Sequence, residues 1–178
     1  MREPADADRL RAFMEALAAN ARDECRVYFT GGATAVLEGW RKQTIDADIL
    51  IVPDSDPLLR AIPQIKESLH INVELASPAH FIPELPGWED RSRFIERRGR
   101  VSFFHYDFYA QALAKIERGE VKDLGDVDQM VRRGLVERGK AWELFRGLEA
   151  RLYRYPDIDP ASFRAAVQES LGPESEDR

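Results

Sequence analysis

Two aspartates near the middle of the chain carry the clearest chemical signal in the sequence. Asp46 and Asp48 open the apolar run 49–52 (Ile-Leu-Ile-Val), which is typical of a β-strand. Residues two apart on a strand point to the same face, so the two carboxylates would lie about 6–7 Å apart. Two like charges on an apolar strand are costly unless a cation neutralises them. Because Mg²⁺ prefers carboxylate and phosphate oxygens, the spacing predicts a magnesium site.

A glycine pair earlier in the chain predicts a phosphate-binding turn. The apolar strand 26–29 runs into Thr30-Gly31-Gly32, where two residues without a Cβ let the backbone turn sharply and approach a ligand. A short helix should begin there, and the free N–H groups and positive dipole of its first turn suit phosphate oxygens. The hydroxyl of Thr30 or Thr34 would add a hydrogen bond. We expect this turn to face the metal site.

A third carboxylate is predicted on a neighbouring strand. Alternation along residues 71–75 places Glu74, together with Asn72, on the face opposite Val73. A glycine pair or an Asp-x-Asp sequence alone is weak, since glycine pairs also form ordinary strand-to-helix turns. A purely structural sheet, however, has no reason to line one face with three carboxylates. The combination predicts a catalytic and metal-binding site formed by Asp46, Asp48 and Glu74.

The surrounding periodicity predicts an α/β (α+β) fold, with a mixed sheet flanked by helices and the site on the carboxylate face. Amphipathic helices are expected at about residues 7–20 and 58–69, with Pro63 disturbing or splitting the second. Residues 92–95 and 101–104 predict a hairpin. The proline-rich segment 76–90 should be an ordered loop with its large apolar side chains tucked in: Phe81, Ile82, Leu85 and Trp88.

Three regions are expected along the chain. Residues 1–104 would form the α/β core, residues 105–171 a helical part packed on it, and residues 172–178 a polar, disordered tail. The helical part follows from apolar periodicity that begins near Tyr106.

Composition limits the possible classes of protein. The chain is 44% hydrophobic and 33% charged, has no apolar run of membrane-spanning length, and begins with charged residues. We therefore expect a cytoplasmic protein without a membrane partner. The single cysteine, Cys25, permits no internal disulfide, and the three histidines lack the spacing of zinc ligands.

The charge distribution leaves one open question about nucleic acid. A net charge of −6 argues against tight non-specific binding of nucleic acid. The segment 91–100 nevertheless concentrates positive charge. Solvated arginines on a hairpin are the favoured interpretation, and a patch that steers triphosphate or RNA is the alternative. The arginines are Arg91, Arg93, Arg97, Arg98 and Arg100.

These motifs resemble those of the nucleotidyltransferase superfamily typified by DNA polymerase beta. In that pattern a Gly-Gly or Gly-Ser turn precedes Asp-x-Asp or Asp-x-Glu on an apolar strand, as Thr30-Gly31-Gly32 precedes 46–49 (Asp-Ala-Asp-Ile) here. Within the superfamily the chain is most similar to the toxin-type group related to AbiEii and MenT, and to an uncharacterised bacterial family of nucleotidyltransferase-like proteins beside it. There a Gly-Gly-Thr-Ala-like turn precedes Arg and then Thr-x-Asp-x-Asp, matching residues 31–35 and 41–48. A later lysine helix and Lys-Asp-Leu-x-Asp element match residues 115–118 and 122–126.

The resemblance implies a role for each matching residue. Asp46 and Asp48 would hold Mg²⁺, with two ions expected, and Glu74 would complete the metal site or accept the proton of the attacking hydroxyl. The turn would hold the β- and γ-phosphates of a nucleoside triphosphate. Lys115 and Asp123 would also bind nucleotide, although a lysine on a helix flank is more often solvated and an acid in a first helical turn is often a simple cap. The implied nucleotide-binding residues are Thr30, Gly31, Gly32, Thr34, Lys115 and Asp123.

The function implied is Mg²⁺-dependent transfer of a nucleoside monophosphate from an NTP to a hydroxyl acceptor, either an RNA 3′ end or a protein. A toxin of this kind would have an antitoxin protein as partner. Two other classes stay open. One is a non-catalytic module that keeps the fold and binds a partner. The other is a metal-dependent phosphohydrolase, although such enzymes usually recruit histidine ligands and these histidines do not cluster.

Overall fold

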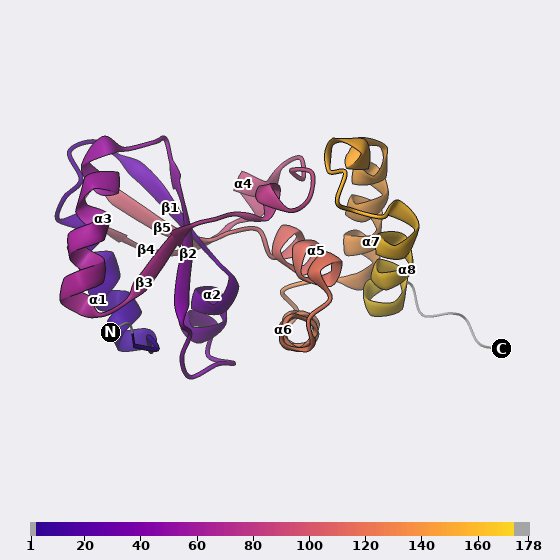
Figure 1. Ribbon diagram of the computed structural model, residues 1–178, viewed down its shortest axis with the longest axis horizontal. Coiled ribbons are helices and arrows are strands. Elements are labelled where there is room, and N and C mark those ends of the chain that lie inside the picture. Colours follow the sequence, from indigo (N-terminus) through magenta and orange to yellow (C-terminus); the bar gives the residue numbers. More distant parts are fainter. Residues whose placement is uncertain (1–2, 173–178) are drawn as a thin grey trace. The chain divides into compact units, whose positions relative to one another are not determined.

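The computed structural model describes residues 3–172, and the last six residues of the predicted tail lie outside this range. The N-terminal part of the described chain contains a five-stranded mixed sheet of order β3-β2-β1-β5-β4 (Figure 1). The α/β prediction is therefore confirmed. The strands are β1 (Cys25–Thr30), β2 (Asp46–Val52), β3 (Asn72–Leu75), β4 (Arg93–Arg98) and β5 (Val101–His105). The α-helices are α1 (Ala7–Ala18), α2 (Gly31–Glu38), α3 (Asp56–Leu69), α4 (Trp88–Arg91), α5 (Phe108–Arg118), α6 (Val121–Arg132), α7 (Arg138–Leu148) and α8 (Pro160–Leu171), and short 3₁₀ helices are η1 (Pro78–His80) and η2 (Glu149–Arg154).

The chain folds into two compact units. The sheet unit comprises residues 3–77 and 92–106, and the helical unit comprises residues 78–91 and 107–172. The segment 78–91, which contains η1 and α4, is thus grouped with the helices, whereas the predicted core extended unbroken to residue 104.

Strand pairing within the sheet unit is mixed. β1 runs antiparallel to β2 and parallel to β5, β2 runs parallel to β3, and β4 and β5 form the predicted antiparallel hairpin. In β2 the residues alternate: Ala47, Ile49 and Ile51 are buried in the core, and Asp46 and Asp48 lie on the opposite face. The sheet therefore has one apolar face and one face that carries the acidic side chains.

Helices α1 and α3 lie side by side against the apolar face (Figure 1). Each helix begins where a side chain accepts a hydrogen bond from a free N–H group, Asp6 from Arg9 N in α1 and Ser55 from Leu58 N in α3. Their apolar stripes are buried, which contributes about 1.5–3 kcal/mol for each large side chain. The stripes consist of Leu10, Phe13, Met14 and Leu17 in α1 and Leu58, Ile62 and Ile65 in α3.

Pro63 does not split its helix, contrary to one of the two predicted outcomes. α3 runs without a break from Asp56 to Leu69 with Pro63 inside it. A proline in a helix interior costs about 3 kcal/mol, because it removes one backbone hydrogen bond and crowds the preceding turn. Burial of Leu58, Ile62 and Ile65 on the other side of the helix offsets that cost.

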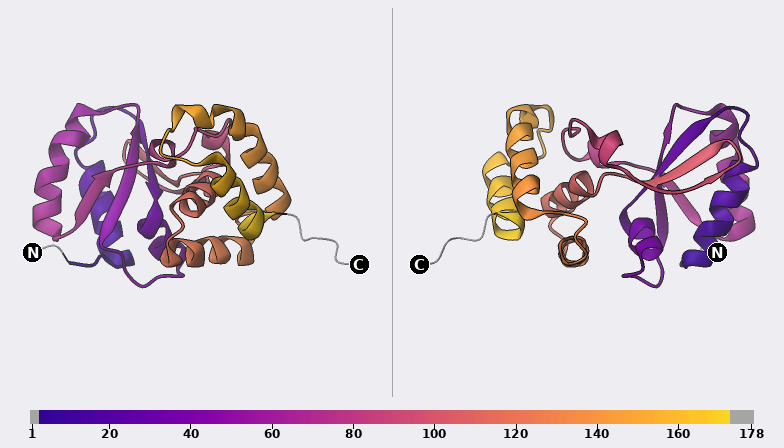
Figure 2. Two further views of the ribbon diagram at one scale, coloured as in Figure 1. Left: turned by 45° about the vertical axis from the view of Figure 1, so that its right-hand side comes forward. Right: turned by 180° about the vertical axis from the view of Figure 1, so that it is seen from behind.

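Helices α5, α7 and α8 pack against one another in the helical unit (Figures 1 and 2). Phe145 and Phe163 meet edge to face with ring centroids 5.0 Å apart. The loop after β3 is ordered, as predicted, and its Ile82, Leu85 and Trp88 are buried. The prediction for Phe81 is wrong, because that ring is 42% exposed.

Candidate functional site

Four polar side chains share the face of the sheet opposite α1 and α3. The register pairs Asp46 with Asn72 and Asp48 with Glu74 across β2 and β3, and paired residues point to the same side. We call this group the acidic face: Asp46, Asp48, Asn72 and Glu74. Asp46 and Asp48 are half-buried and Glu74 is exposed, so a ligand in solvent can reach the carboxylates.

The glycine turn lies directly against the acidic face. Thr30, the last residue of β1, is paired with Asp48, and α2 begins at the next residue. Gly31 has a φ of +64°, and a Cβ built on it would lie 3.0 Å from Asp48 Oδ2. A Cβ on Gly32 would lie 2.1 Å from Thr44 Oγ1. Any residue other than glycine would therefore have to displace the Thr44 side chain. Both positions therefore require glycine, and the N-terminus of α2 is held beside Asp48.

The two threonines near the turn have different surroundings. Thr34 is fully buried, and its hydroxyl donates to Phe29 O at 3.1 Å and lies 3.1 Å from His105 Nδ1. That hydroxyl supports the turn from the interior. Thr30 is the N-cap of α2, makes no capping hydrogen bond with its side chain, and shares the face of Asp48. Of the two predicted alternatives for a phosphate contact, the geometry favours Thr30.

A buried histidine behind the turn was not singled out by sequence reasoning. His105 ends β5 beside Phe29, and its Nε2 lies 3.2 Å from Glu38 Oε1 while Nδ1 faces Thr34. These contacts connect β5 to the middle and to the C-terminal end of α2. No local sequence pattern signals them, because the three residues come together only through the parallel pairing of β1 with β5.

Asn72 connects two of the carboxylates on the acidic face. Its side-chain amide donates to Asp46 Oδ1 and, at 3.2 Å, to Glu74 Oε1. Its own Oδ1 is buried and has no hydrogen-bond partner within residues 3–172. An unsatisfied buried acceptor costs about 1–3 kcal/mol. The alternation in residues 71–75 did place Asn72 beside Glu74, but its role as a bridge depends on the position of β2.

The acidic face suits Mg²⁺ better than a metal that needs a closed protein cage. Among the residues described, no group of three or more His, Cys, Asp or Glu side chains is gathered closely enough to hold a metal ion. Mg²⁺ is usually held by one or two carboxylates and completes its shell with water and substrate phosphates. Asp46 and Asp48, with the glycine turn beside them, meet that requirement, and Asn72 holds Glu74 at the edge of the pair.

Lys115 and Asp123 belong to the helical unit, where they bind each other. Lys115 Nζ lies 2.8 Å from Asp126 Oδ2 and 3.2 Å from Asp123 Oδ1, and all three side chains are buried. Arg118 Nε lies at ion-pair distance, 3.3 Å, from Asp123 Oδ2. Lys115 is therefore a cross-link between α5 and α6 rather than a solvated flank residue. A nucleotide-binding role for Lys115 and Asp123 stays a prediction.

Most arginines of the basic segment 91–100 form ion pairs with acidic side chains. On β4, Arg97 lies 2.8 Å from Glu24 and Arg98 lies 3.1 Å from Glu96. The first pair is exposed and the second is partly buried, and both agree with the favoured interpretation of the segment as hairpin decoration. Arg91 differs, because it pairs at 2.7 Å with Asp107, whose side chain is fully buried.

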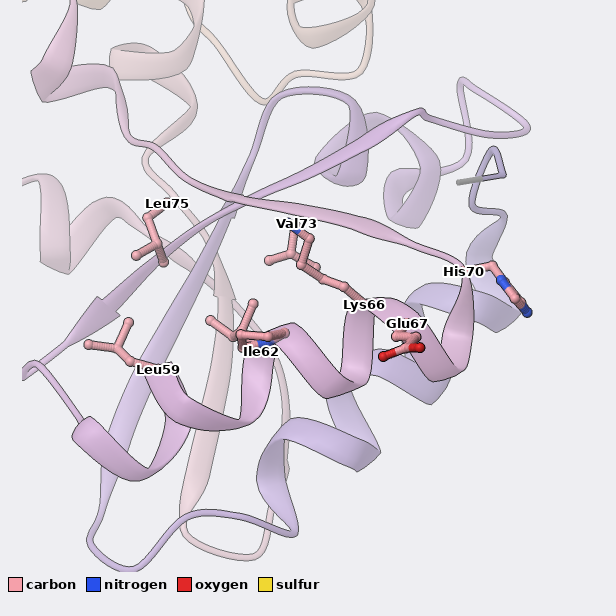
Figure 3. Close-up of a pocket in the computed structure, with 8 residues that line it drawn as sticks. Leu59, Ile62, Lys66, Glu67, His70, Val73 and Leu75 are labelled. Carbon is pink, nitrogen blue, oxygen red and sulfur yellow. The ribbon is translucent and has the colours of Figure 1, made fainter. Parts of the chain in front are cut away.

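An apolar groove of about 680 Å³ lies elsewhere in the sheet unit, between α3 and the edge strand β3 (Figure 3). Val73 and Leu75 line it, and they alternate with Asn72 and Glu74 along the strand. The groove therefore lies on the opposite side of β3 from the acidic face and contributes nothing to the carboxylate site.

Comparison with known protein families identifies the class of fold. A family model described as "nucleotidyltransferase of unknown function (DUF6036)" matches residues 8–155. The chain belongs to this family. The match includes the glycine turn, the acidic face and the α5–α6 cross-link, so the nucleotidyltransferase superfamily prediction is confirmed, and particular similarity to AbiEii and MenT stays a prediction. No curated protein and no solved structure matches the chain.

The chain shows no membrane span in the part that the structure describes. None of the helices within residues 3–172 combines the length and apolar character that crossing a bilayer requires.

Proposed function

We propose that this nucleotidyltransferase-family chain transfers a nucleoside monophosphate from an NTP to a hydroxyl acceptor in a Mg²⁺-dependent reaction. The observation that carries the proposal is the close approach of the glycine turn to Asp48, where even a Cβ on Gly31 would lie 3.0 Å from the carboxylate. It puts the N-terminus of α2, which is the positive end of the helix dipole, beside carboxylates that suit Mg²⁺. A phosphate chain and its counter-ion could therefore be bound at adjoining positions.

Each group would have one task. The N–H groups at the start of α2 and the Thr30 hydroxyl bind the β- and γ-phosphates, while Asp46 and Asp48 hold Mg²⁺. Bound there, Mg²⁺ supplies charge neutralisation of the phosphates and activation of the acceptor hydroxyl. The acceptor oxygen forms a bond to the α-phosphorus, the bond from that phosphorus to its bridging oxygen breaks, and pyrophosphate leaves. Glu74, which is exposed, accepts the hydroxyl proton and returns it to water.

The acceptor and the biological role are further parts of the proposal. An RNA 3′ end and a protein side chain are the two candidate acceptors, and a toxin with a cognate antitoxin protein is the candidate role. Support for the toxin role comes from the similarity of residues 31–35 and 41–48 to the AbiEii and MenT motifs.

Transfer of label tests the proposal. Protein is incubated with Mg²⁺, α-labelled NTPs and either RNA or protein acceptors, and Asp48→Ala is compared with the matched variant Asp54→Ala, which removes an exposed acid in the turn after β2. We expect label on an acceptor with wild type and Asp54→Ala, and a loss of at least about 100-fold in Asp48→Ala. Equal transfer by Asp48→Ala, or none by wild type with any NTP, contradicts the proposal.

A second candidate function is a non-catalytic binding module. One observation favours it: the described residues gather no three-ligand metal group, and Asn72 already binds two of the acids. Calorimetry separates the two functions, since a module of this kind would bind neither Mg²⁺ nor NTP.

A further inference from the structure

Asn72 lies between two carboxylates of the acidic face and is far less accessible than they are. Only 5% of the residue is exposed. Both hydrogen bonds from its amide nitrogen go to carboxylates, one on Asp46 and one on Glu74. Its oxygen has no partner within residues 3–172. Buried polar atoms are paired in nearly all cases, so this orphaned oxygen calls for an explanation.

The orientation of the amide follows from the chemistry of its neighbours. Carboxylates only accept hydrogen bonds, so turning the amide around would point its oxygen at Asp46 and Glu74 and leave no donor between them. In the observed orientation the amide nitrogen donates a hydrogen bond to each acid, and the amide oxygen is left without a partner within residues 3–172. An apolar β-branched residue at this buried strand position would pack without that loss. The asparagine at position 72 is therefore explained by its hydrogen bonds to the two acids rather than by packing in the core.

We propose that Asn72 is a positioning residue for the divalent-cation site, a statement that rests on the proposed function. Its amide fixes one oxygen of Asp46 and one of Glu74 before a cation arrives. Each acid keeps its second oxygen for the cation or for the acceptor proton. Without the shared amide donor, the negative carboxylates of Asp46 and Glu74 repel each other and move apart. The site is thus arranged in advance by a neutral side chain that does not bind the cation itself.

Binding of Mn²⁺ to the full chain tests this role directly. The electron paramagnetic resonance signal of free Mn²⁺ reports binding to wild type, Asn72→Ala and Asn20→Ala. Asn20 is the matched control, because it is the other asparagine of the chain and its exposed amide only caps the end of α1 through Ala16 O. Groups that orient metal ligands typically contribute about 10–100-fold in affinity, so we expect a loss of that size in Asn72→Ala and no change in Asn20→Ala.

The outcomes separate the two proposals. If Asn72→Ala binds Mn²⁺ as tightly as wild type, the positioning role is overturned and the metal site stands. If wild type itself binds no Mn²⁺, the proposed function fails, and the positioning role fails with it.

A second variant keeps the test valid if Asn72→Ala does not fold. Asn72→Asp preserves the shape of the side chain but replaces the N–H donors with a third negative charge between Asp46 and Glu74. We expect a lower melting temperature than wild type without cation, and a larger rise on adding Mn²⁺, because the cation then replaces the lost donors. An equal rise in the two proteins would overturn the proposal.

Discussion

Gly32 shows how little change the site tolerates at the scale of a single residue. An added Cβ would meet Thr44 Oγ1 at 2.1 Å and Thr44 Cβ at 2.8 Å. The Thr44 hydroxyl donates to Asp46 O, so displacing it also disturbs the start of β2. A methyl group added in the turn would therefore displace Thr44, and through Thr44 it would shift the backbone of Asp46.

We therefore predict that Gly32→Ala lowers the free energy of unfolding by about 1–3 kcal/mol, as overpacking does, and weakens NTP binding. Urea denaturation and nucleotide titration measure the two effects. The matched change Gly125→Ala, in α6 where a Cβ would meet nothing within 4 Å, should be neutral or stabilising by about 0.5–1 kcal/mol. Equal effects of the two variants would contradict the proposed contact with Thr44.

Asp107 supplies a prediction about pH at the same scale. Burial raises the pKa of Asp107 above its ordinary value of 3.8, and the Arg91 guanidinium offsets part of that rise. A carboxyl whose folded pKa lies above its unfolded pKa stabilises the fold fully below the unfolded value. That contribution is lost as the pH rises through the folded pKa. Arg91 limits the loss because it favours the charged form.

Removing Arg91 should enlarge this pH dependence. We expect Arg91→Ala to cost about 3–5 kcal/mol at neutral pH, because a buried charge is left without its partner. The deficit should shrink as the pH falls, because burial raises the pKa of Asp107 and loss of Arg91 raises it further, so that the carboxyl takes up a proton and the unpaired charge disappears. Urea denaturation over a pH series measures it. Arg97→Ala, which removes one side of an exposed pair, is the control and should change little at any pH.

The cross-link between α5 and α6 is the feature to test at the scale of elements. Three buried charged groups hold the two helices, with Lys115 between Asp123 and Asp126. Breaking such a group by removing one member leaves uncompensated charge, whereas replacing the whole group by neutral residues is often tolerated.

Lys115→Met should therefore destabilise the chain by about 3–5 kcal/mol. The triple variant Lys115→Met, Asp123→Asn, Asp126→Asn should recover most of that loss, and Lys122→Met, on an exposed position of α6, should have almost no effect. Denaturant unfolding measures all three. Should the triple variant regain stability but not label transfer, a nucleotide role for Lys115 or Asp123 gains support. Regained stability together with full transfer would leave only the structural role.

Charge governs behaviour at the scale of the whole molecule. The net charge is −6 and the isoelectric point about 5.2, and arginines of β4 are paired with nearby glutamates. Non-specific affinity for nucleic acid comes from released counter-ions, which needs many unpaired cations along a surface. An RNA acceptor would therefore have to be recognised by a few specific contacts.

We predict that unstructured single-stranded RNA binds with a Kd no tighter than about 10⁻⁶ M at physiological salt. Fluorescence anisotropy with a labelled oligonucleotide measures it. Sub-micromolar binding that persists at raised salt would contradict this expectation and revive the interpretation of segment 91–100 as an RNA surface.

The sequence by itself determined the elements and the composition of the site. The alternation of β2 fixed the common face of Asp46 and Asp48, and two glycines before a helix fixed the turn, because both signals depend only on residues close together in the chain. The periodicity of α1 and α3 fixed their buried stripes in the same way.

Only the tertiary structure decided what those side chains touch. The bridge from Asn72 to Asp46 and the buried contact of Thr34 with His105 join residues that are distant in sequence. The enclosure of Lys115 by two aspartates joins two successive helices. Such contacts depend on strand register and helix packing, which arise from the sum of many weak apolar contacts rather than from a local pattern. The same sum kept α3 intact across Pro63, because the burial of its apolar stripe outweighs one lost backbone hydrogen bond.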